Sequence, residues 1–486
     1  MKYTRIALIG VAATFFLFGV CGQAPAVPDK PKGPSQAMVD VAVACTTQTT
    51  DPKEADVAYQ FDWGDGTRLE WSAYGAPGQP FVATHAYTLT GSYEVKVRAR
   101  NSKKVSGWSE PLGVFVNPGE GAVRWDFAYV VDEDSADFSL NTFAIDDERD
   151  ACYVGCEFGL VLARRLNKAL RWRFFSTDED EFMSPPSVGD DGTVYIGCAN
   201  DSFYALNPDG SRKWASYLGD EVLAGAAIGT GGTVFVHTTG DSLLALSPAG
   251  ARLWSYRTGG GVSSPVIGKD GTVFVASQDG TLYALDPSSG GRKWDYSMAA
   301  TEIAASPAID DALGVIYIAD DEGRVGSVNT GDGSDNWQVR VGEGPSSLVI
   351  GPDHTVYLGA DGKLYALNHE SGAARWSYTP PMSFAAVSTP AVAANGSVYF
   401  LATLGKKDFS EPDTLYAVNA DGSRRWACAL GEGYSDETMS APKLDSEGNI
   451  YIGSGLVGWC VRGASGPAAS GWPMFQADGR STGRAR

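Results

Sequence analysis

The sequence predicts an all-β fold, and three observations carry this prediction. From residue 123 onward, a pattern of four short apolar runs separated by Gly, Pro and Asp recurs eight times. Each copy spans about 40–45 residues, which is the length of one four-stranded propeller blade. The chain has 59 glycines to supply turns, and no segment shows the sustained 3.6-residue apolar period of an amphipathic helix. We therefore expect an eight-bladed β-propeller.

The clearest copy of the repeat shows its four strands in order. They are Ser264-Pro265-Val266-Ile267-Gly268, Gly271-Thr272-Val273-Phe274-Val275, Leu282-Tyr283-Ala284-Leu285-Asp286 and Gly291-Arg292-Lys293-Trp294. The second strand is a run of β-branched and aromatic residues without polar alternation. Such a run is typical of a strand that is covered on both faces, as a strand between neighbouring blades would be.

One aromatic residue in the second strand and one tryptophan in the fourth strand mark each copy. The second-strand aromatics are Tyr153, Tyr195, Phe235, Phe274, Tyr317, Tyr357, Tyr399 and Tyr451. The fourth-strand tryptophans are Trp172, Trp214, Trp254, Trp294, Trp337, Trp376 and Trp426. The eighth tryptophan is either Trp125, upstream in Val123-Arg124-Trp125-Asp126-Phe127, or Trp472. Trp125 is favoured, because an N-terminal strand that completes the last blade removes an open sheet edge.

The first 26 residues read as a signal peptide. Lys2 and Arg5 form a positive start, and residues 6–20 are apolar but too short to span a bilayer comfortably. Two processing sites stay open: release after Ala24-Pro25-Ala26, or a lipobox-like sequence that ends at Cys21 and would be lipidated there. Residues 27–34 form a Pro-rich tether in either case.

A small β domain is expected at residues 35–117. It contains Trp63-Gly64-Asp65-Gly66, His85-Ala86-Tyr87 and the alternating strand Gly91-Ser92-Tyr93-Glu94-Val95-Lys96-Val97. These motifs resemble a polycystic-kidney-disease (PKD) domain, which implies an immunoglobulin-like β-sandwich acting as a spacer or adhesion module. Asp62 and Asp65 are the candidates for a weak calcium site, although carboxylates at such positions also cap turns without a metal.

The repeated unit at residues 118–472 resembles the pyrroloquinoline-quinone (PQQ)-like repeat family. The resemblance rests on Ala-x-Asp/Asn…Gly…Trp copies such as Ala284-Leu285-Asp286…Trp294 and Ala417-Val418-Asn419…Trp426. It implies eight blades and tryptophans that dock between them. The family includes quinoprotein dehydrogenases and cofactor-free scaffolds, such as the propeller lipoprotein of the outer-membrane β-barrel assembly machinery. Residues 473–486 are expected to be a C-terminal tail.

The sequence lacks the groups that quinoprotein enzymes use. It has no adjacent cysteines for a vicinal disulfide, no clear calcium ligand set and no Cys-x-x-Cys-His haem motif. Its four histidines show no metal-ligand spacing, and His237 is read as a packed or rim residue. We therefore expect no enzyme and no cofactor. A periplasmic PQQ-dependent oxidoreductase is the first alternative, and a carbohydrate-binding surface protein is the second.

The odd count of seven cysteines is consistent with modification of Cys21, and the other six are interpreted as structural. Cys152, Cys156, Cys198 and Cys460 each replace a small packed residue of other copies, and Cys152 and Cys156 are too far apart along one strand to form a disulfide. No disulfide framework is therefore expected, even though an exported protein would permit one.

The charge distribution is the most informative functional feature. The chain carries 58 acidic and 38 basic residues, and a net charge of −20 disfavours nucleic acid and anionic lipid surfaces. Many acids lie between the outer strand of one blade and the inner strand of the next, and such loops all emerge on one face of a propeller. This predicted acidic face comprises Asp132, Glu133, Asp134, Asp178, Glu179, Asp180, Glu181, Asp220, Glu221, Glu302, Glu343, Glu432, Asp436 and Glu437.

Two interpretations of the acidic face stay open. One is a solubilising surface with no partner, and the other is a binding surface for a basic protein segment or a divalent cation. An insertion at residues 403–414, with Lys406 and Phe409, falls between the second and third strands of the seventh blade and so belongs to the same face. It is either a partner contact or a tolerated surface insertion.

Taken together, these features predict an exported, non-enzymatic scaffold in the periplasm, on the outer membrane as a lipoprotein, or on the cell surface. We expect it to be a monomer that binds a protein partner through the propeller. Nucleic acid is not expected as a partner, and a membrane is expected only through a lipid anchor.

Overall fold

The computed structural model describes residues 23–38, 41–88, 91–117, 119–128, 142–156, 159–176, 180–298, 302–381, 386–403, 413–430, 440–454, 457–469 and 472–484. The chain divides into two compact units, Met1–Gly119 and Glu120–Arg486. Almost all regular structure in the described ranges is β-strand, with two short 3₁₀ turns at Asp147–Arg149 and Thr230–Gly232. No helix in these ranges is long and apolar enough to cross a membrane.

The first unit contains two sheets. A four-stranded sheet has the order β1 (Gln36–Met38), β6 (Leu112–Asn117), β5 (Gly91–Arg100) and β3 (Ala58–Asp62), and β2 (Ala42–Thr47) pairs with β4 (Phe81–Ala86). Strand β5 alternates as its sequence predicts, with Val95, Val97 and Ala99 buried and the residues between them partly exposed. These side chains pack with Phe61 and Trp63 in the core of the unit. Every second residue of a half-exposed strand faces the core, as the two-residue period of a strand requires.

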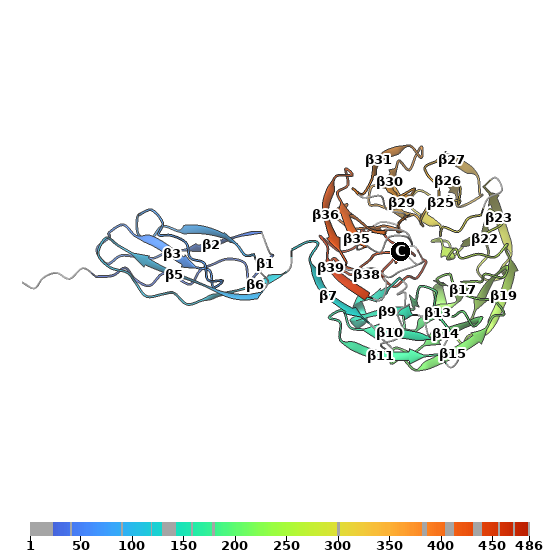
Figure 1. The fold of residues 1–486 in the computed structure, drawn as a ribbon, viewed down its shortest axis with the longest axis horizontal. Coiled ribbons are helices and arrows are strands. Elements are labelled where there is room, and N and C mark those ends of the chain that lie inside the picture. Colours follow the sequence, from blue (N-terminus) through green and yellow to red (C-terminus); the bar gives the residue numbers. More distant parts are fainter. Residues whose placement is uncertain are drawn as a thin grey trace, which may run out of the picture. The chain divides into compact units, whose positions relative to one another are not determined.

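The second unit consists of similar antiparallel sheets arranged in a ring (Figure 1). The first sheet contains β8 (Ala144–Asp146), β9 (Ala151–Cys156), β10 (Leu160–Arg164) and β11 (Leu170–Phe175), and the second contains β12 (Ser187–Val188), β13 (Val194–Gly197), β14 (Ser202–Leu206) and β15 (Arg212–Tyr217). The third contains β16 (Ala227–Ile228), β17 (Val234–His237), β18 (Ser242–Leu246) and β19 (Arg252–Arg257), and the fourth contains β20 (Val266–Ile267), β21 (Val273–Ala276), β22 (Thr281–Leu285) and β23 (Arg292–Ser297).

The ring continues with sheets built in the same way. They are β24 (Ala308–Asp310), β25 (Val315–Ala319), β26 (Arg324–Asn329) and β27 (Asp335–Arg340); β28 (Val349–Ile350), β29 (Val356–Ala360), β30 (Lys363–Leu367) and β31 (Ala374–Tyr378); β32 (Ala386–Val387), β33 (Ala391–Val392), β34 (Val398–Thr403), β35 (Thr414–Val418) and β36 (Arg424–Ala429); and β37 (Lys443–Leu444), β38 (Asn449–Ser454) and β39 (Val457–Arg462) with β7 (Val123–Ala128).

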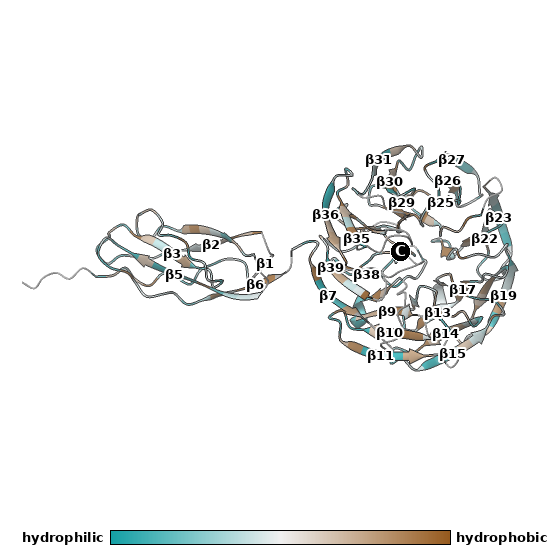
Figure 2. Cartoon of the chain, in the orientation of Figure 1, coloured by the Kyte–Doolittle hydropathy of each residue, from teal (hydrophilic) through white to brown (hydrophobic). Residues whose placement is uncertain are grey.

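Burial follows the position of each strand in its sheet. Second strands such as β13 and β21 are buried throughout, whereas the fourth strands, such as β15 and β23, alternate between exposed and half-buried residues. The fourth strands form the periphery of the ring in Figure 1, and hydrophilic residues appear along β23 and β36 in Figure 2. The apolar runs of the sequence therefore lie between neighbouring sheets, where both of their faces are covered.

Each second-strand aromatic contacts the tryptophan of its own sheet. The ring centroids lie 5.5–5.9 Å apart in all eight pairs, from Tyr153 with Trp172 to Tyr451 with Trp125. These distances are within the range of favourable aromatic contacts. The repeated residues of the sequence therefore occupy repeated positions in space.

The same tryptophans connect neighbouring sheets. Seven of the eight donate the indole N–H to a backbone carbonyl oxygen in the next sheet at 2.8–3.1 Å, as Trp214 does to Pro248. The tryptophan also packs on a glycine of the next turn. A Cβ atom on Gly250, which has φ +83°, would lie 2.7 Å from the Trp214 ring, so this position needs glycine both for its backbone and for its contact.

The last sheet is completed by the N-terminal strand of the unit. Strand β7 pairs antiparallel with β39, and Trp125 lies opposite Cys460. This is the closing strand that the sequence favoured. The junction also explains why Trp426 differs from the other tryptophans. No continuous turn joins β39 to β7. The Trp426 ring packs on Gly121, and its buried indole nitrogen has no hydrogen-bond partner among the described residues.

The alternative closing residue, Trp472, lies elsewhere. It begins a segment, residues 472–484, that runs through the centre of the ring (Figure 1) and that we call the channel segment. Trp472 is 1% exposed and packs with residues such as Ile309 and Ile350. The expected C-terminal tail is thus part of the second compact unit.

The channel segment is held by the first strands of the sheets. Six backbone N–H groups donate to its carbonyl oxygens at 2.7–2.9 Å; the donors are Ile350, Val392, Ile145, Val188, Ile228 and Ile267. A first strand has a free edge toward the channel, and unpaired N–H groups there are costly when they are buried. The segment satisfies them, which accounts for the burial of its polar residues, such as Ser481 and Thr482.

Candidate functional site: an acidic rim

In successive sheets of the described ranges, the loop that precedes the first strand accepts the same backbone hydrogen bond. The amide N–H of the turn between the second and third strands donates to the loop carbonyl oxygen, as Ala199 does to Glu181 at 2.9 Å and Thr239 does to Glu221 at 3.0 Å. Asp321 and Glu302, and then Asp361 and Glu343, repeat the contact at 3.0 Å. Because the contact recurs sheet after sheet, these loops and turns share one side of the ring.

Predicted acidic residues occupy these loops. Asp180, Glu181, Glu221 and Glu343 are exposed, while Asp220 and Glu302 are half-buried. The other predicted members lie outside the described residues: Asp132, Glu133, Asp134, Asp178, Glu179, Glu432, Asp436 and Glu437. Residues 404–412 of the insertion, and Cys21, lie outside them as well.

The turns add acidic residues that the sequence analysis missed. They are Asp201, Asp241, Asp279, Asp321, Glu322 and Asp361, all in turns between second and third strands. The position of these residues between the second and third strands could have indicated the turns in the sequence. That the turns adjoin the acidic loops is shown only by the backbone hydrogen bonds between them. The acidic rim is defined here as these six residues together with Asp180, Glu181, Asp220, Glu221, Glu302 and Glu343.

Electrostatic contacts in the rim are mixed. Burial, together with the nearby charges of Glu302 and Asp320, raises the pKa of Asp321. Arg324 neutralises part of the charge through Asp320 at 2.7 Å and Glu322 at 3.1 Å. In contrast, Asp220 and Glu221 have no ion-pair partner within the described ranges. Their charges are therefore not offset by an ion pair in the part of the chain that the structure describes.

Carboxylates at the opposite turns have structural partners. Asp191 accepts hydrogen bonds from the backbone N–H and hydroxyl of Thr193 at 2.9 and 2.8 Å and from Lys213 at 3.0 Å. Asp270 and Asp353 repeat this arrangement in other sheets. Although burial opposes it, these hydrogen bonds lower the pKa of Asp191. Acidic residues thus lie on both sides of the ring, but those at the opposite turns stabilise the turns themselves.

The carboxylates proposed as calcium ligands in the first unit also make local contacts within turns. Asp65 accepts from the Thr67 backbone at 2.9 Å and contacts His85 Nε2 at 2.7 Å, and Asp62 pairs with Arg68 at 2.8 Å. Among the described residues, no group of three or more His, Cys, Asp and Glu side chains is placed to hold a metal ion. None of the six cysteines in these ranges forms a disulfide, and burial raises the pKa of Cys152 to about 12.

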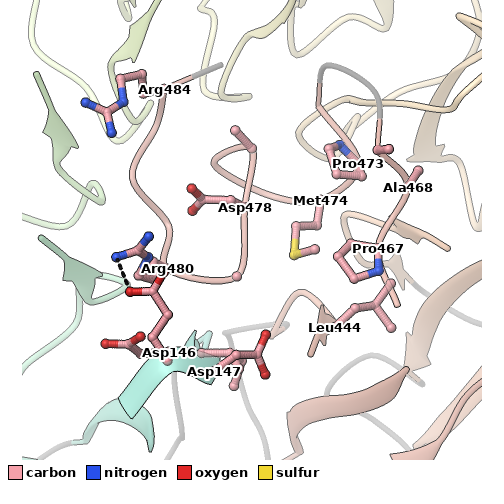
Figure 3. A pocket seen from close by; sticks show the side chains of 15 residues that line it. Asp146, Asp147, Leu444, Pro467, Ala468, Pro473, Met474, Asp478, Arg480 and Arg484 are labelled. Carbon is pink, nitrogen blue, oxygen red and sulfur yellow. Dashed lines mark ion pairs between the residues drawn. The ribbon is translucent and has the colours of Figure 1, made fainter. Parts of the chain in front are cut away.

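A cavity of about 370 Å³ lies between the channel segment and the turn after β8 (Figure 3). Asp146, Glu148 and Asp478 line it together with Arg480 and Arg484. The charges pair with one another or with neighbours: Arg480 contacts Glu148 at 3.9 Å and Asp190 at 3.4 Å, and Asp146 binds Arg149 at 2.9 Å. The arrangement secures the channel segment.

Comparisons with protein families match both units. A family model described as outer membrane protein assembly factor BamB matches residues 114–378 and 321–455. A PKD domain model matches residues 32–107. These matches agree with the two resemblances noted in the sequence.

Solved structures share the ring architecture. The BamB structure from Moraxella catarrhalis is 19% identical with a TM-score of 0.56, covering 70% of this chain and 99% of that one. The C-terminal WD40 domain of Sif2 is 9% identical with a TM-score of 0.56, covering 69% of this chain and 99% of that one. Identities this low show a shared propeller fold and nothing about ligands.

One curated relative matches part of the chain. The serine/threonine-protein kinase AfsK of Streptomyces griseus is 29% identical over 183 residues, which are 35% of this chain. The match spans about a fifth of the kinase, 21% of its length. The match is therefore to a limited region of that protein.

Proposed function

This chain belongs to the family described as outer membrane protein assembly factor BamB, and on that premise we propose that it is a non-enzymatic scaffold that binds a basic segment of another protein. In this proposal the sheets of the second unit are the eight blades of one closed propeller. The PKD domain is an immunoglobulin-like spacer. The protein is exported, either released after Ala26 or anchored through a lipid at Cys21.

The acidic rim is the observation that carries the proposal. Loops and turns from successive sheets bring carboxylates to one side of the ring, and Asp220 and Glu221 have no ion-pair partner within the described part of the chain. The channel segment occupies the centre of the ring, so a partner is expected on a face of the propeller. Clustered negative charge attracts a basic partner and speeds its association.

The proposal is tested with fluorescent oligolysine and the full chain. The variant Asp220→Asn/Glu221→Gln should weaken binding about fivefold at low salt, because two charge contacts of roughly 0.5 kcal/mol each are lost. The matched control, Glu370→Gln/Glu447→Gln, removes the same charge at turns on the opposite side. Fluorescence anisotropy measures both affinities, and binding should weaken as salt rises.

Two results would contradict the proposal. Equal weakening by both double variants would show that net charge alone attracts the peptide. Binding that is unchanged by salt and by Asp220→Asn/Glu221→Gln would show that the rim is not the binding surface.

A further inference from the structure

A second charged surface, of opposite sign, lies on the first unit. On β5, Arg98 and Arg100 alternate with the buried Val97 and Ala99, so both arginines lie on the outer face of the sheet. Strand β3 lies beside them, with Gln60 opposite Arg98 and Ala58 opposite Arg100. The outer face of this β3–β5 pair therefore carries two neighbouring guanidinium groups.

Irregular segments on both flanks add aromatic rings to this face. Next to β3, the backbone N–H of Ser72 donates to Tyr59 at 2.9 Å, and this contact places Trp71 beside the sheet. Next to β5, the N–H groups of Ser106 and Ser109 donate to Ala99 and Val97 at 2.8 Å, which positions Trp108. The aromatic residues are thus held by backbone pairing to the strands that carry the arginines.

Guanidinium and aromatic groups alternate across the face. Arg98 lies 4.5 Å from the Trp108 ring and 5.5 Å from the Trp71 ring, and Arg100 lies 4.5 Å from Trp71 and 5.5 Å from Tyr74. Arg68 lies 5.7 Å from Trp108 at the other end. All are within cation–π range. We call this set the arginine–aromatic ladder: Arg68, Trp108, Arg98, Trp71, Arg100 and Tyr74.

Two guanidinium groups in the ladder have no carboxylate partner among the residues that the structure describes. Arg98 donates twice to the Gln60 side-chain oxygen, at 2.9 and 2.7 Å, and the Arg100 guanidinium makes no hydrogen bond or ion pair within the described ranges. Arg68, in contrast, is ion-paired with Asp62. These are also the three arginines of residues 23–117, a segment with nine basic and ten acidic residues. Positive charge is therefore gathered on one face of a nearly neutral domain.

We propose that the arginine–aromatic ladder is a docking surface for an acidic segment of another protein. A guanidinium presents paired N–H donors that match the two oxygens of a carboxylate, and Arg, Trp and Tyr are the residues enriched at the energetic centres of protein interfaces. Neutral sugars stack on free aromatic faces, but each ladder tryptophan already has two guanidinium groups over its ring. The partner that fits is one that brings carboxylates.

This surface goes beyond the acidic rim because it lies on the other unit and selects the opposite charge. The probe is fluorescent polyglutamate, mixed with the full chain. Arg98→Lys/Arg100→Lys keeps the charge but removes the planar donors and their stacking, and it should weaken binding about tenfold. The control, Lys103→Gln/Lys104→Gln, removes two exposed charges of the same domain and should change affinity less than about twofold.

Melting curves and competing ligands complete the test. Thermal unfolding of each variant is followed by circular dichroism. If Arg98→Lys/Arg100→Lys proves unstable, Arg98→Gln/Arg100→Gln is used in its place. The proposal is overturned if the Lys103→Gln/Lys104→Gln control weakens binding as much as the ladder variants do. It is also overturned if polygalacturonate binds and polyglutamate does not, or if sedimentation shows that the ladder binds a second copy of this chain.

Discussion

Two buried titratable side chains of the propeller have oxygen atoms of neighbouring residues as hydrogen-bond partners. His237 is fully buried, with Nδ1 3.0 Å from the Ser263 carbonyl oxygen and Nε2 3.1 Å from the Thr258 hydroxyl. Lys443 is also buried, and its ammonium donates to the Asp478 carbonyl oxygen at 2.9 Å. Burial lowers the pKa of His237 to about 4 and that of Lys443 to about 7. Both positions have structural roles.

We expect acid to destabilise the protein through His237. Its pKa is about 4 in the folded state against 6.5 for a free side chain, so the unfolded chain binds more protons between these pH values. The free energy of unfolding should fall as the pH drops through this interval, by roughly 3 kcal/mol. Urea unfolding at both pH values measures the change. The His237→Gln variant does not titrate at this position, so its free energy of unfolding should depend less on pH. An unchanged pH dependence would contradict the role assigned to His237.

At the scale of elements, the N-terminal and C-terminal segments of the second unit both hold the ring together. Strand β7 completes the sheet of β37, β38 and β39 at the periphery, while the channel segment binds first strands at the centre. A closed ring has no exposed terminal sheet edge, and every sheet has two neighbours. The channel segment adds contacts between residues far apart in the sequence.

We expect removal of residues 472–486 to destabilise the propeller by several kcal/mol. Six first-strand N–H groups would lose their acceptors, and the burial of Trp472 and Met474 would be lost, at roughly 1.5–3 kcal/mol for each side chain. Thermal melting followed by circular dichroism measures the loss. A chain shortened only by residues 485–486 is the control, and equal melting temperatures for the two shortened chains would show that the channel segment contributes nothing.

At the scale of the molecule, surface charge and channel occupancy point to a binding role. The net charge of −20 resides almost entirely in the second unit, since residues 23–117 are close to neutral. The channel segment fills the centre of the ring. A partner of the propeller is therefore expected on one of its faces rather than in its channel.

We expect no quinone-dependent oxidation by this protein. The sequence has no adjacent cysteines for the vicinal disulfide of quinoproteins, and the channel segment occupies the centre of the ring. Protein supplied with PQQ and calcium should show no dye-linked oxidation of alcohols or sugars. Absorbance spectroscopy and a dye-reduction assay measure this, with a quinoprotein dehydrogenase as positive control. Stoichiometric quinone binding with turnover would instead support the oxidoreductase alternative.

The repeat made much of the ring predictable from sequence. The aromatic and tryptophan series placed Tyr195 and Trp214 at equivalent positions of successive sheets, and Trp125 on the strand that completes the last one. The site was only partly predictable. Glu181 and Glu221 were placed on their loops, but turn residues such as Asp201 were missed, because the contact between loop and turn is made across a sheet.

The sequence alone determined the β-strand repeat, the PKD domain ahead of it and the acidic character of the chain, because turn residues, strand composition and charge are local properties. The tertiary structure decided the place of Trp472, the arginine–aromatic ladder, and the indole of Trp426, which has no hydrogen-bond partner among the described residues. Each of these joins residues that are distant along the chain, or depends on where the ring closes. No local pattern encodes such contacts, because they exist only once the sheets have been assembled.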